Sequence, residues 1–533
     1  LIKMDKLAQI DLEHDNMVKS YEDNDIVSMH KSVKAVMRLA GKSYVPKSTR
    51  VINDEGHVSQ SYIEERNCFK KYFRKLMQGS PSKFSEVIDT ERKCDKDRYK
   101  DISEKSWMAI PSPTDVQCMK LLANANKACG ENRIVGAVDK VFPHTMLNIS
   151  YPLIVKTYVR LQPSIQYKGG MIHEIFKGKG HHFMCASYRD VLLANDSGKQ
   201  LSKSIRRKLI PRAKQLVFSS QYGGGFNGGE TSFTHLYVRI ILDTCRAMNI
   251  SSAILFLDVV TAFAMMLRRI VFDLDEGDEA WFHKLSSSGF SKEDILAIKE
   301  TVCAIAPWEI DSNGNLIVCS DEHLVSINVR LSKYWYTNTW MTVEGTDGVF
   351  TTNVGCLAGT PLADLLFTVS VARILYVYRK SINADKLTST ININGVDHIL
   401  DDASFVDDCA IPVVDSAINI ANKVCSIAEV AYKTFKCFNL DLNFSRGKSE
   451  CVLSLCGKGK KKAMQSLFKA GNKVSFVGIK GEQICLLFVK SYKHVGTKIP
   501  FDSTYGEEVS TRCAIMRSGT AKFQKQILKN RSI

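Results

Sequence analysis

Two adjacent aspartates, Asp407 and Asp408, interrupt an apolar stretch between residues 403–406 and 409–411. Phe, Val and Ile favour strands, and a two-residue polar break between short apolar runs predicts the tight turn of a hairpin. That turn would present both carboxylates at one exposed tip. Like charges this close need a proton or a cation to coexist, and Mg²⁺ prefers carboxylate oxygens. An isolated Asp-Asp pair is most often a solvated turn, but with the residues described next it predicts a Mg²⁺ site.

A third carboxylate, Asp258, ends an apolar run of strand length at residues 252–257, and residues 260–268 after it are predicted to form a helix. An Asp at the end of a buried strand is costly unless it is paired or binds a cation. Capping of the following helix is the alternative role. Two divalent ions about 3.5 to 4 Å apart, clamped by carboxylates from two strands, are a standard device for nucleotidyl transfer. The three aspartates are therefore candidate ligands for two Mg²⁺ ions, with Mn²⁺ as a substitute.

A second aspartate pair, Asp401 and Asp402, lies just upstream of the first. It has the same chemistry, but it follows residues 395–398 and leads into the predicted strand instead of interrupting it. We therefore expect these two carboxylates to lie on the surface.

The order and spacing of these segments resemble the palm of a reverse transcriptase, most closely that of the non-LTR (LINE-type) retrotransposon group. Residues 405–408 resemble the family's aromatic-x-Asp-Asp box, and residues 256–263 resemble its first catalytic box. The resemblance implies that three aspartates are catalytic and bind metal, the last of them in support of the other two: Asp258, Asp407 and Asp408. Phe263 falls where the family keeps an aromatic residue that blocks a ribose 2′-hydroxyl, which implies selection of deoxynucleotides.

Residues 355–367 predict a glycine turn that leads into a buried helix, with Thr360 as N-cap and Pro361 at the first helical position. The loop resembles the family's Gly-x-x-Gln-Gly-x-Pro-Leu-Ser-Pro box, which supports the template and the incoming nucleotide. Gly359 is the matching substrate-binding residue. The chain departs from this box at two positions, Ala358 for Gln and Asp364 for the second Pro.

Two further segments resemble boxes downstream of the aspartate pair. Residues 439–450 resemble the box in which a Lys near the triphosphate can protonate the leaving pyrophosphate, and Lys448 matches that catalytic Lys. A solvated surface charge is the alternative for any single Lys. Residues 491–496 resemble the short hairpin that grips the primer end.

Upstream, residues 166–180 and 187–193 predict a basic hairpin in which glycines permit close approach of phosphate groups. This hairpin resembles the fingers of the family, where an Arg binds the triphosphate. Arg189 is the matching residue, Lys177 or Lys179 would assist it, and Asp190 replaces the family's usual Pro. Residues 221–229 resemble the family's Gln-Phe-Gly-Phe block, although a flexible glycine-rich loop explains them equally well.

The composition favours a globular protein with a polyanionic partner. The 533 residues correspond to roughly three or four domain-sized units, and 45% are hydrophobic. Lys and Arg outnumber Asp and Glu by 72 to 56, which gives a net charge of +16 and indicates nucleic acid as the partner. The basic excess gathers at residues 203–214 and 458–462, each of which could also be a solubilising face.

The 16 cysteines include no CxxC pair and no cysteine–histidine cluster with zinc spacing, so neither a zinc knuckle nor a disulfide framework is predicted. The most apolar run, residues 254–267, is too short to span a bilayer and contains Asp258. The N-terminus lacks a basic-then-apolar signal pattern. We therefore expect a nuclear or cytoplasmic protein without a membrane segment.

The predicted fold class is α+β, a right-hand polymerase with fingers, a palm whose antiparallel sheet carries the catalytic aspartates, and a partial thumb. We expect a helical connector at residues 1–110, the fingers with an N-terminal extension at 111–250, the palm at 251–485, and the primer grip with a truncated thumb at 486–533. Helices are predicted at three further segments: residues 59–77, 115–128 and 510–528. The first residue is Leu, and no endonuclease precedes the connector. We therefore expect a fragment or a decayed copy of a longer element.

The resemblance implies an RNA-directed DNA polymerase, a nucleotidyltransferase that adds dNTPs to a primer 3′-hydroxyl. Its partners would be an RNA template, a DNA primer and dNTPs. The alternative is an inactive relic that only binds nucleic acid, which Ala358, Asp190 and the missing ends motivate. A mobile-intron maturase shares the palm but would need an RNA-binding region after the thumb.

Overall fold

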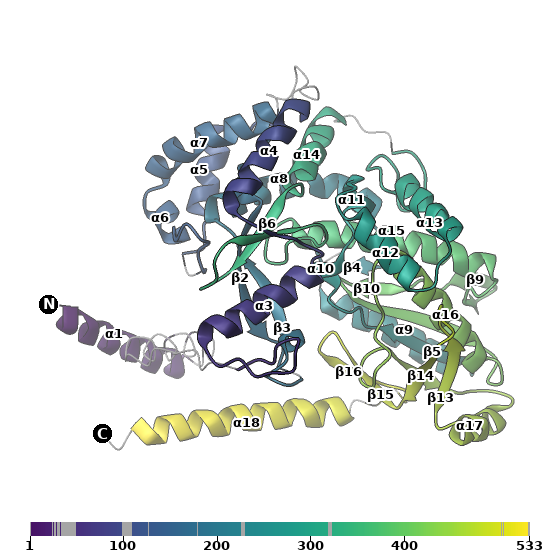
Figure 1. Cartoon of the computed structure of the whole chain (residues 1–533). Coiled ribbons are helices and arrows are strands. Elements are labelled where there is room, and N and C mark those ends of the chain that lie inside the picture. Colours follow the sequence, from purple (N-terminus) through teal and green to yellow (C-terminus); the bar gives the residue numbers. More distant parts are fainter. Residues whose placement is uncertain are drawn as a thin grey trace. The chain divides into compact units, whose positions relative to one another are not determined.

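The computed structural model (Figure 1) describes residues 2–23, 25, 28, 32, 50–98, 109–125, 127–178, 180–224, 230–317, 322–502, 504 and 506–530. The chain divides into two compact units, residues 1–65 and 66–533. The first contains helix α1 (Ile2–Glu22) and a short bridge between Ile52 and Val58. Every sheet among the described residues belongs to the second unit, which mixes helices with mostly antiparallel strands and confirms the predicted α+β class.

The larger sheet of the second unit carries the predicted catalytic aspartates. Its seven strands lie in the order β13 (Lys473–Val477), β14 (Gln483–Val489), β12 (Glu450–Ser454), β5 (Ser251–Leu257), β11 (Asp408–Asp415), β10 (Ala403–Phe405) and β4 (Gln221–Tyr222). Strand β5 lies between β12 and β11 and pairs antiparallel with both. All seven of its residues are buried because strands flank it on both edges and helices pack on it. The β5 strand predicted at residues 252–257 is confirmed.

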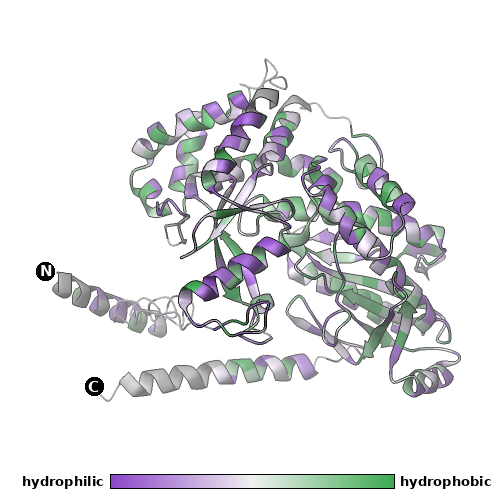
Figure 2. Ribbon diagram, in the orientation of Figure 1, coloured by the Kyte–Doolittle hydropathy of each residue, from purple (hydrophilic) through white to green (hydrophobic). Residues whose placement is uncertain are grey.

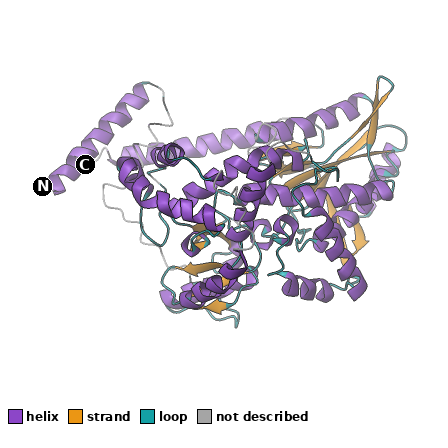
Figure 3. Cartoon of the chain, turned by 90° about the horizontal axis from the view of Figure 1, so that it is seen from above, coloured by secondary structure: helices purple, strands orange, loops and turns teal. Residues whose placement is uncertain are grey.

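Helices cover this sheet and close its hydrophobic core (Figures 2 and 3). Helix α9 (Thr231–Ala247) packs its apolar face, which includes Val238 and Leu242, on Ile254 and Phe256 of β5. Helix α16 (Ile420–Cys437) contacts β5, β11 and β13 through apolar residues that recur every three or four positions. The long helix α15 (Ala363–Ala384) packs in turn on α16.

The second sheet carries the predicted basic hairpin. Its five strands lie in the order β1 (Pro81–Ser82), β7 (Val349–Thr352), β6 (Thr339–Val343), β2 (Gly169–Phe176) and β3 (Tyr188–Leu193). Strands β2 and β3 pair antiparallel from Phe176 opposite Tyr188 to Met171 opposite Leu193, so the predicted hairpin is confirmed. Its connection includes Lys179, which lies outside the described residues, as do residues 225–229 of the predicted glycine-rich loop.

The remaining elements complete the second unit. The helices are α3 (Tyr62–Leu76), which spans the boundary between the units, α4 (Phe84–Arg98), α5 (Pro113–Leu121), α6 (Gly136–Val141), α7 (Pro143–Arg160), α8 (Asp196–Leu216), α10 (Ala262–Met265), α11 (Arg269–Phe272), α12 (Asp278–Ser287), α13 (Lys292–Ile305), α14 (Glu322–Trp335), α17 (Lys460–Lys469) and α18 (Gly506–Asn530). The hairpins are β8 (Thr390–Ile393) with β9 (Val396–Ile399), and β15 (Ser491–His494) with β16 (Thr497–Pro500). No described helix combines the length and the hydropathy that crossing a bilayer requires.

The helix predicted at residues 260–268 is wrong, because only the four-residue α10 forms there before α11 begins. The carbonyl of Phe263 accepts a hydrogen bond from the N–H of Cys356 at 2.9 Å, and the carbonyl of Met266 accepts one from Gly355 at 2.8 Å. A continuing helix would need both carbonyls for its own i to i+4 bonds. The loop before α15 therefore takes over the backbone groups that would have extended the helix.

Four other helices differ from the predictions in their bounds. Helix α15 begins at Ala363 with Leu362 as its N-cap, two residues later than expected. Helix α5 ends at Leu121 instead of residue 128 and begins earlier, at Pro113, because Ser112 and Asp115 form a capping box. Helix α18 covers the predicted segment 510–528 and extends it at both ends, and α3 lies within the predicted 59–77.

A candidate active site at the ends of β5 and β11

Strands β5 and β11 place two of the predicted aspartates opposite each other. Their register runs from Asp415 opposite Ser251 to Cys409 opposite Leu257. Asp408 and Asp258 are the residues next to the last pair of this ladder, and the Asp258 charge acts on the Asp408 carboxyl. Side chains at opposed positions of an antiparallel pair point to the same face, with Cβ atoms about 4.5 to 5.5 Å apart. The sheet therefore brings together carboxylates that are far apart in the sequence.

The third aspartate, Asp407, lies in the turn between β10 and β11. Phe405 pairs with Asp408, so the two turn residues are Val406 and Asp407, and the predicted Asp407–Asp408 turn is wrong by one residue. Val406 has a φ of 60°, a region that β-branched side chains rarely adopt. A glycine is usual where the first residue of a two-residue hairpin turn has positive φ. Strain of this kind costs on the order of 1–3 kcal/mol and occurs preferentially at functional sites.

The three carboxylates repel one another electrostatically. Burial, followed by the charges of Asp407 and Asp258, raises the pKa of Asp408 to about 6. Burial and then the Asp258 charge also raise the pKa of Asp407. Arg189 and Lys448 only partly offset these effects. A cation placed among these oxygens would relieve the repulsion.

Lys448 provides one such cation, because its Nζ lies 3.0 and 3.2 Å from the two carboxylate oxygens of Asp258. The loop that carries it is bonded to the end of β5. The N–H of Asn443 donates to the carbonyl of Asp258 at 2.9 Å, and the N–H of Asp258 donates to Oγ of Ser449 at 3.0 Å. The structure thus brings Lys448 to Asp258, and its role as a proton donor to the pyrophosphate stays a prediction.

The basic hairpin contributes two more cations, Lys177 and Arg189. Burial lowers the pKa of Lys177, the Asp190 carboxylate opposes that shift, and smaller effects of Lys448, Arg189 and Asp258 show that these groups lie within electrostatic reach. Arg189 in turn lowers the pKa of Asp407. The third predicted basic residue of this hairpin, Lys179, lies outside the described residues.

Gly359 and Phe263 lie on the segments that border the aspartates. Gly359 has a φ of 105°, and a Cβ there would approach the carbonyl oxygen of Leu192 to 2.7 Å. The N–H of Leu192 also donates to the carbonyl of Ala358 at 2.8 Å, so the loop before α15 rests directly on β3. Phe263 stacks on Phe367 of α15 with ring centroids 4.6 Å apart. Both residues thus hold the loop and α10 in place, and their contacts with a nucleotide stay a prediction.

One residue near the aspartates was not predicted as part of the site. Tyr492 of the β15–β16 hairpin stacks on Phe256 of β5 with ring centroids 4.3 Å apart. Burial raises the pKa of Tyr492, and the charges of Asp258 and Asp408 raise it further. The sequence contained a signal for this position, because 491–496 was predicted as the hairpin that grips the primer, but it gave Tyr492 no role.

The donor chemistry of the site fits a hard divalent ion, because three carboxylates with mutual repulsion are the groups that such ions prefer. The arrangement is not a closed metal cage. Within the described residues, no three or more His, Cys, Asp or Glu side chains are grouped so as to hold a metal ion. Asp258 instead binds the Lys448 ammonium. Metal binding would therefore require Lys448 to release Asp258.

The prediction that Asp401 and Asp402 are both surface residues is wrong for Asp402. The Asp402 side chain is 2% exposed, and its Oδ1 lies 2.7 Å from Nε of Arg379. Asp401 is 46% exposed and lies 3.4 Å from another nitrogen of the same guanidinium. The sequence could not reveal this partner, because Arg379 lies on α15 and reaches the pair only in the folded chain.

Comparison with known proteins does not assign the chain to a family. No protein-family model matches the chain, and no curated protein matches it in sequence. A functional assignment therefore depends on the residues of the site and their arrangement.

Proposed function

We propose that the chain is an RNA-directed DNA polymerase of the non-LTR (LINE-type) reverse transcriptase family. The supporting observation is the convergence of Asp258, Asp407 and Asp408 near the ends of β5 and β11, where burial and the neighbouring carboxylates raise the pKa of Asp407 and of Asp408. In this proposal the fold is a right-hand polymerase. The partners are an RNA template, a DNA primer and dNTPs, consistent with a net charge of +16.

In this proposal, each group of residues in the site has a separate role in nucleotidyl transfer. Asp258, Asp407 and Asp408 would hold two Mg²⁺ ions, which activate a primer hydroxyl and neutralise the charge on a leaving pyrophosphate. Arg189 and Lys177 would bind the triphosphate, because guanidinium and ammonium groups form strong charge-assisted hydrogen bonds with phosphate. Lys448, released from Asp258, would stand next to the reacting phosphates as a proton donor.

The second candidate function is nucleic-acid binding without catalysis. The observation that favours it is the Lys448–Asp258 ion pair, which neutralises one of the three carboxylates. If this pair persists when metal is present, the site lacks a ligand that two-metal chemistry needs. Such a protein would bind RNA or DNA with a steep dependence on salt and would incorporate no nucleotide.

Primer extension separates the two candidates. The assay measures Mg²⁺-dependent dNTP incorporation on an RNA template with a DNA primer by the intact chain, its Asp407→Asn variant and its Asp415→Asn variant. Asp415 is the matched control, since it lies at the opposite end of the same strand β11. We expect Asp407→Asn to reduce incorporation by about 10³-fold or more, and Asp415→Asn to retain it.

Template binding by all three proteins is measured in parallel and should change little. Incorporation that survives in Asp407→Asn would contradict the assignment of the metal site. Binding by the intact chain without any incorporation would support the second candidate instead.

A further inference from the structure

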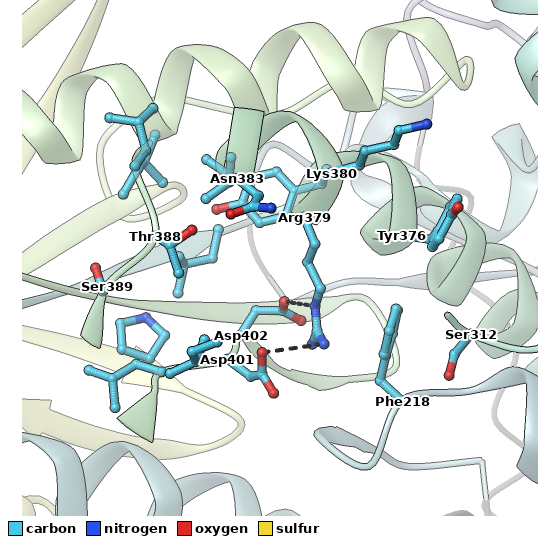
Figure 4. A pocket seen from close by; sticks show the side chains of 18 of the residues that line it. Phe218, Ser312, Tyr376, Arg379, Lys380, Asn383, Thr388, Ser389, Asp401 and Asp402 are labelled. Atoms are coloured by element: carbon cyan, nitrogen blue, oxygen red, sulfur yellow. Dashed lines mark hydrogen bonds and ion pairs between the residues drawn. The ribbon is translucent and has the colours of Figure 1, made fainter. Parts of the chain in front are cut away.

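A cavity of about 500 Å³ lies beside Asp401 and Asp402 (Figure 4), and none of the residues proposed for the polymerase site lines it. Its walls come from the C-terminal half of α15, the segment after β9, strand β11 and helix α16. The apolar part of the wall includes Leu387, Ile399, Leu400 and Ile411. Its volume lies in the range of about 300–1,000 Å³ that is typical of small-molecule sites.

Two carboxylates and two cations line the cavity, but only one of these cations forms ion pairs with the carboxylates. Asp401 and Asp402 share the single guanidinium of Arg379, and the described part of the chain provides no other ion pair to either carboxylate. Lys380 also lines the cavity, but Figure 4 shows its ammonium pointing away from both carboxylates. Two carboxylates with one cation leave one negative charge without a partner.

The two carboxylates of the pair differ in how far a ligand can reach them. Oδ2 of Asp402 is buried, and no described group donates a hydrogen bond to it. A buried carboxylate oxygen without a donor is costly, by about 1–3 kcal/mol or more for a charged group. Asp401, which is 46% exposed, lies next to it in the cavity wall and is open to a ligand.

The cavity is poorly suited to an anion. The guanidinium nitrogens of Arg379 are engaged by Asp402 at 2.7 Å, by Asp401 at 3.4 Å and by Oγ of Ser220 at 2.8 Å. One face of the guanidinium lies on the Phe218 ring, 3.8 Å from its centroid. A phosphate or carboxylate would meet two carboxylates and a cation whose three nitrogens each already face an oxygen of the protein.

We propose that this cavity binds a small organic cation, an amine or amidinium group on an apolar body, with the cation on Asp401 and the apolar body between Leu387, Ile399 and Ile411. The cation would supply the missing positive charge at the aspartate pair. The apolar body would cover the side chain of Ile399, which is 65% exposed. This site is separate from the proposed polymerase site and does not depend on it.

Calorimetric titration of the intact chain with three probes of one shape tests the proposal. Benzamidinium carries the cation, benzamide is its neutral analogue, and benzoate is the anion. We expect benzamidinium to bind about tenfold more tightly than benzamide, and benzoate to bind least, because only the first forms a charge-assisted hydrogen bond with Asp401. Equal affinity for all three probes, or no measurable binding of benzamidinium, would overturn the proposal.

Two variants and one control locate the binding. Asp401→Asn should weaken benzamidinium about tenfold and leave benzamide unchanged. Ile399→Lys should also weaken benzamidinium, because the new ammonium competes for Asp401 from an exposed position that tolerates substitution. Asp385→Asn is the control, since Asp385 is exposed at the end of α15 and does not line the cavity. Benzamidinium affinity that is unchanged in both variants would place its binding elsewhere and reject the site.

Discussion

Two aspartate pairs flank strand β10, and their environments are opposite. Asp402 is buried against Arg379, which also reaches Asp401, so a cation lies next to both carboxylates of that pair. Asp407 and Asp408 face a third carboxylate, Asp258, and burial together with these like charges raises the pKa of both. Nearby Lys448 is bound to Asp258.

This difference separates a structural pair from a candidate catalytic pair. A buried carboxylate with an ion partner stabilises the fold around it, and removal of that carboxylate leaves the partner cation unpaired. Carboxylates that repel one another destabilise the fold, and they are retained where their charge is needed for binding or chemistry. The same Asp→Asn substitution should therefore have opposite effects on stability at the two pairs.

The largest expected effect on stability is at the paired site. Asp402→Asn should lower the free energy of unfolding by about 3 kcal/mol, because it breaks an ion pair whose carboxylate is 2% exposed. Urea denaturation at pH 7 measures this loss. Asp401→Asn is the control, and its cost should stay below about 1 kcal/mol because its carboxylate is 46% exposed. Equal costs at the two positions would show that Asp402 and Arg379 do not form the pair described.

At Asp407 and Asp408, we expect the substitution to increase stability instead of lowering it. Asp408→Asn should raise the free energy of unfolding by about 2 kcal/mol at pH 8 without divalent ions, because it removes a charge that burial and two neighbouring carboxylates disfavour. The matched substitution Asp415→Asn, at the other end of β11, should change stability by less than about 0.5 kcal/mol. A loss of stability in Asp408→Asn would mean that the three carboxylates do not repel one another in the folded chain.

The stability gap between the intact chain and Asp408→Asn should depend on pH. The pKa of Asp408 is about 6 in the folded chain, above the ordinary Asp value of about 3.9 in the unfolded chain. The folded state therefore binds more protons between these values, and the intact chain loses stability as pH rises through this window. Denaturation series at several pH values should show no gap below about pH 4 and the full gap above about pH 6 to 7. A gap that is constant from pH 4 to pH 8 would contradict the raised pKa.

The smallest expected effect on stability is at Val406, in the turn that precedes Asp408. Val406→Gly removes a half-buried side chain, but it also relieves a β-branched residue at a φ of 60°. The two effects should nearly cancel, so stability should change by less than about 0.5 kcal/mol. Val191→Gly on strand β3 is the control and should cost more than about 1 kcal/mol, because Val191 is also half-buried but has no positive φ to relieve. Equal losses in the two variants would show that the turn is not strained.

Local sequence patterns predicted the elements that carry the aspartates. The apolar run before Asp258 is strand β5, and the apolar runs on both sides of Asp407 and Asp408 are the strands of a hairpin. Strand propensity and a polar break are sufficient for such elements, because both act over a few residues. The turn is displaced by one residue because Asp408 pairs with Phe405 of β10 and so belongs to β11, which leaves Val406 in the turn.

Features that depend on distant residues were not predictable in the same way. Arg379 pairs with Asp402 only in the folded chain, so nothing in the local sequence distinguished Asp402 from a surface residue. The helix predicted after Asp258 is interrupted because Gly355 and Cys356, from the loop before α15, bond to its carbonyls. In both cases a tertiary contact outweighed a local preference.

Divalent-ion binding tests the central contrast between the two pairs most directly. Mn²⁺ is titrated into the intact chain, Asp407→Asn and Asp401→Asn at pH 7.5, and bound Mn²⁺ is measured by electron paramagnetic resonance. We expect Asp407→Asn to weaken Mn²⁺ binding by about tenfold or more and Asp401→Asn to bind as the intact chain does, because only the first substitution removes a carboxylate of the repelling cluster. Equal Mn²⁺ affinity in all three proteins would contradict the account.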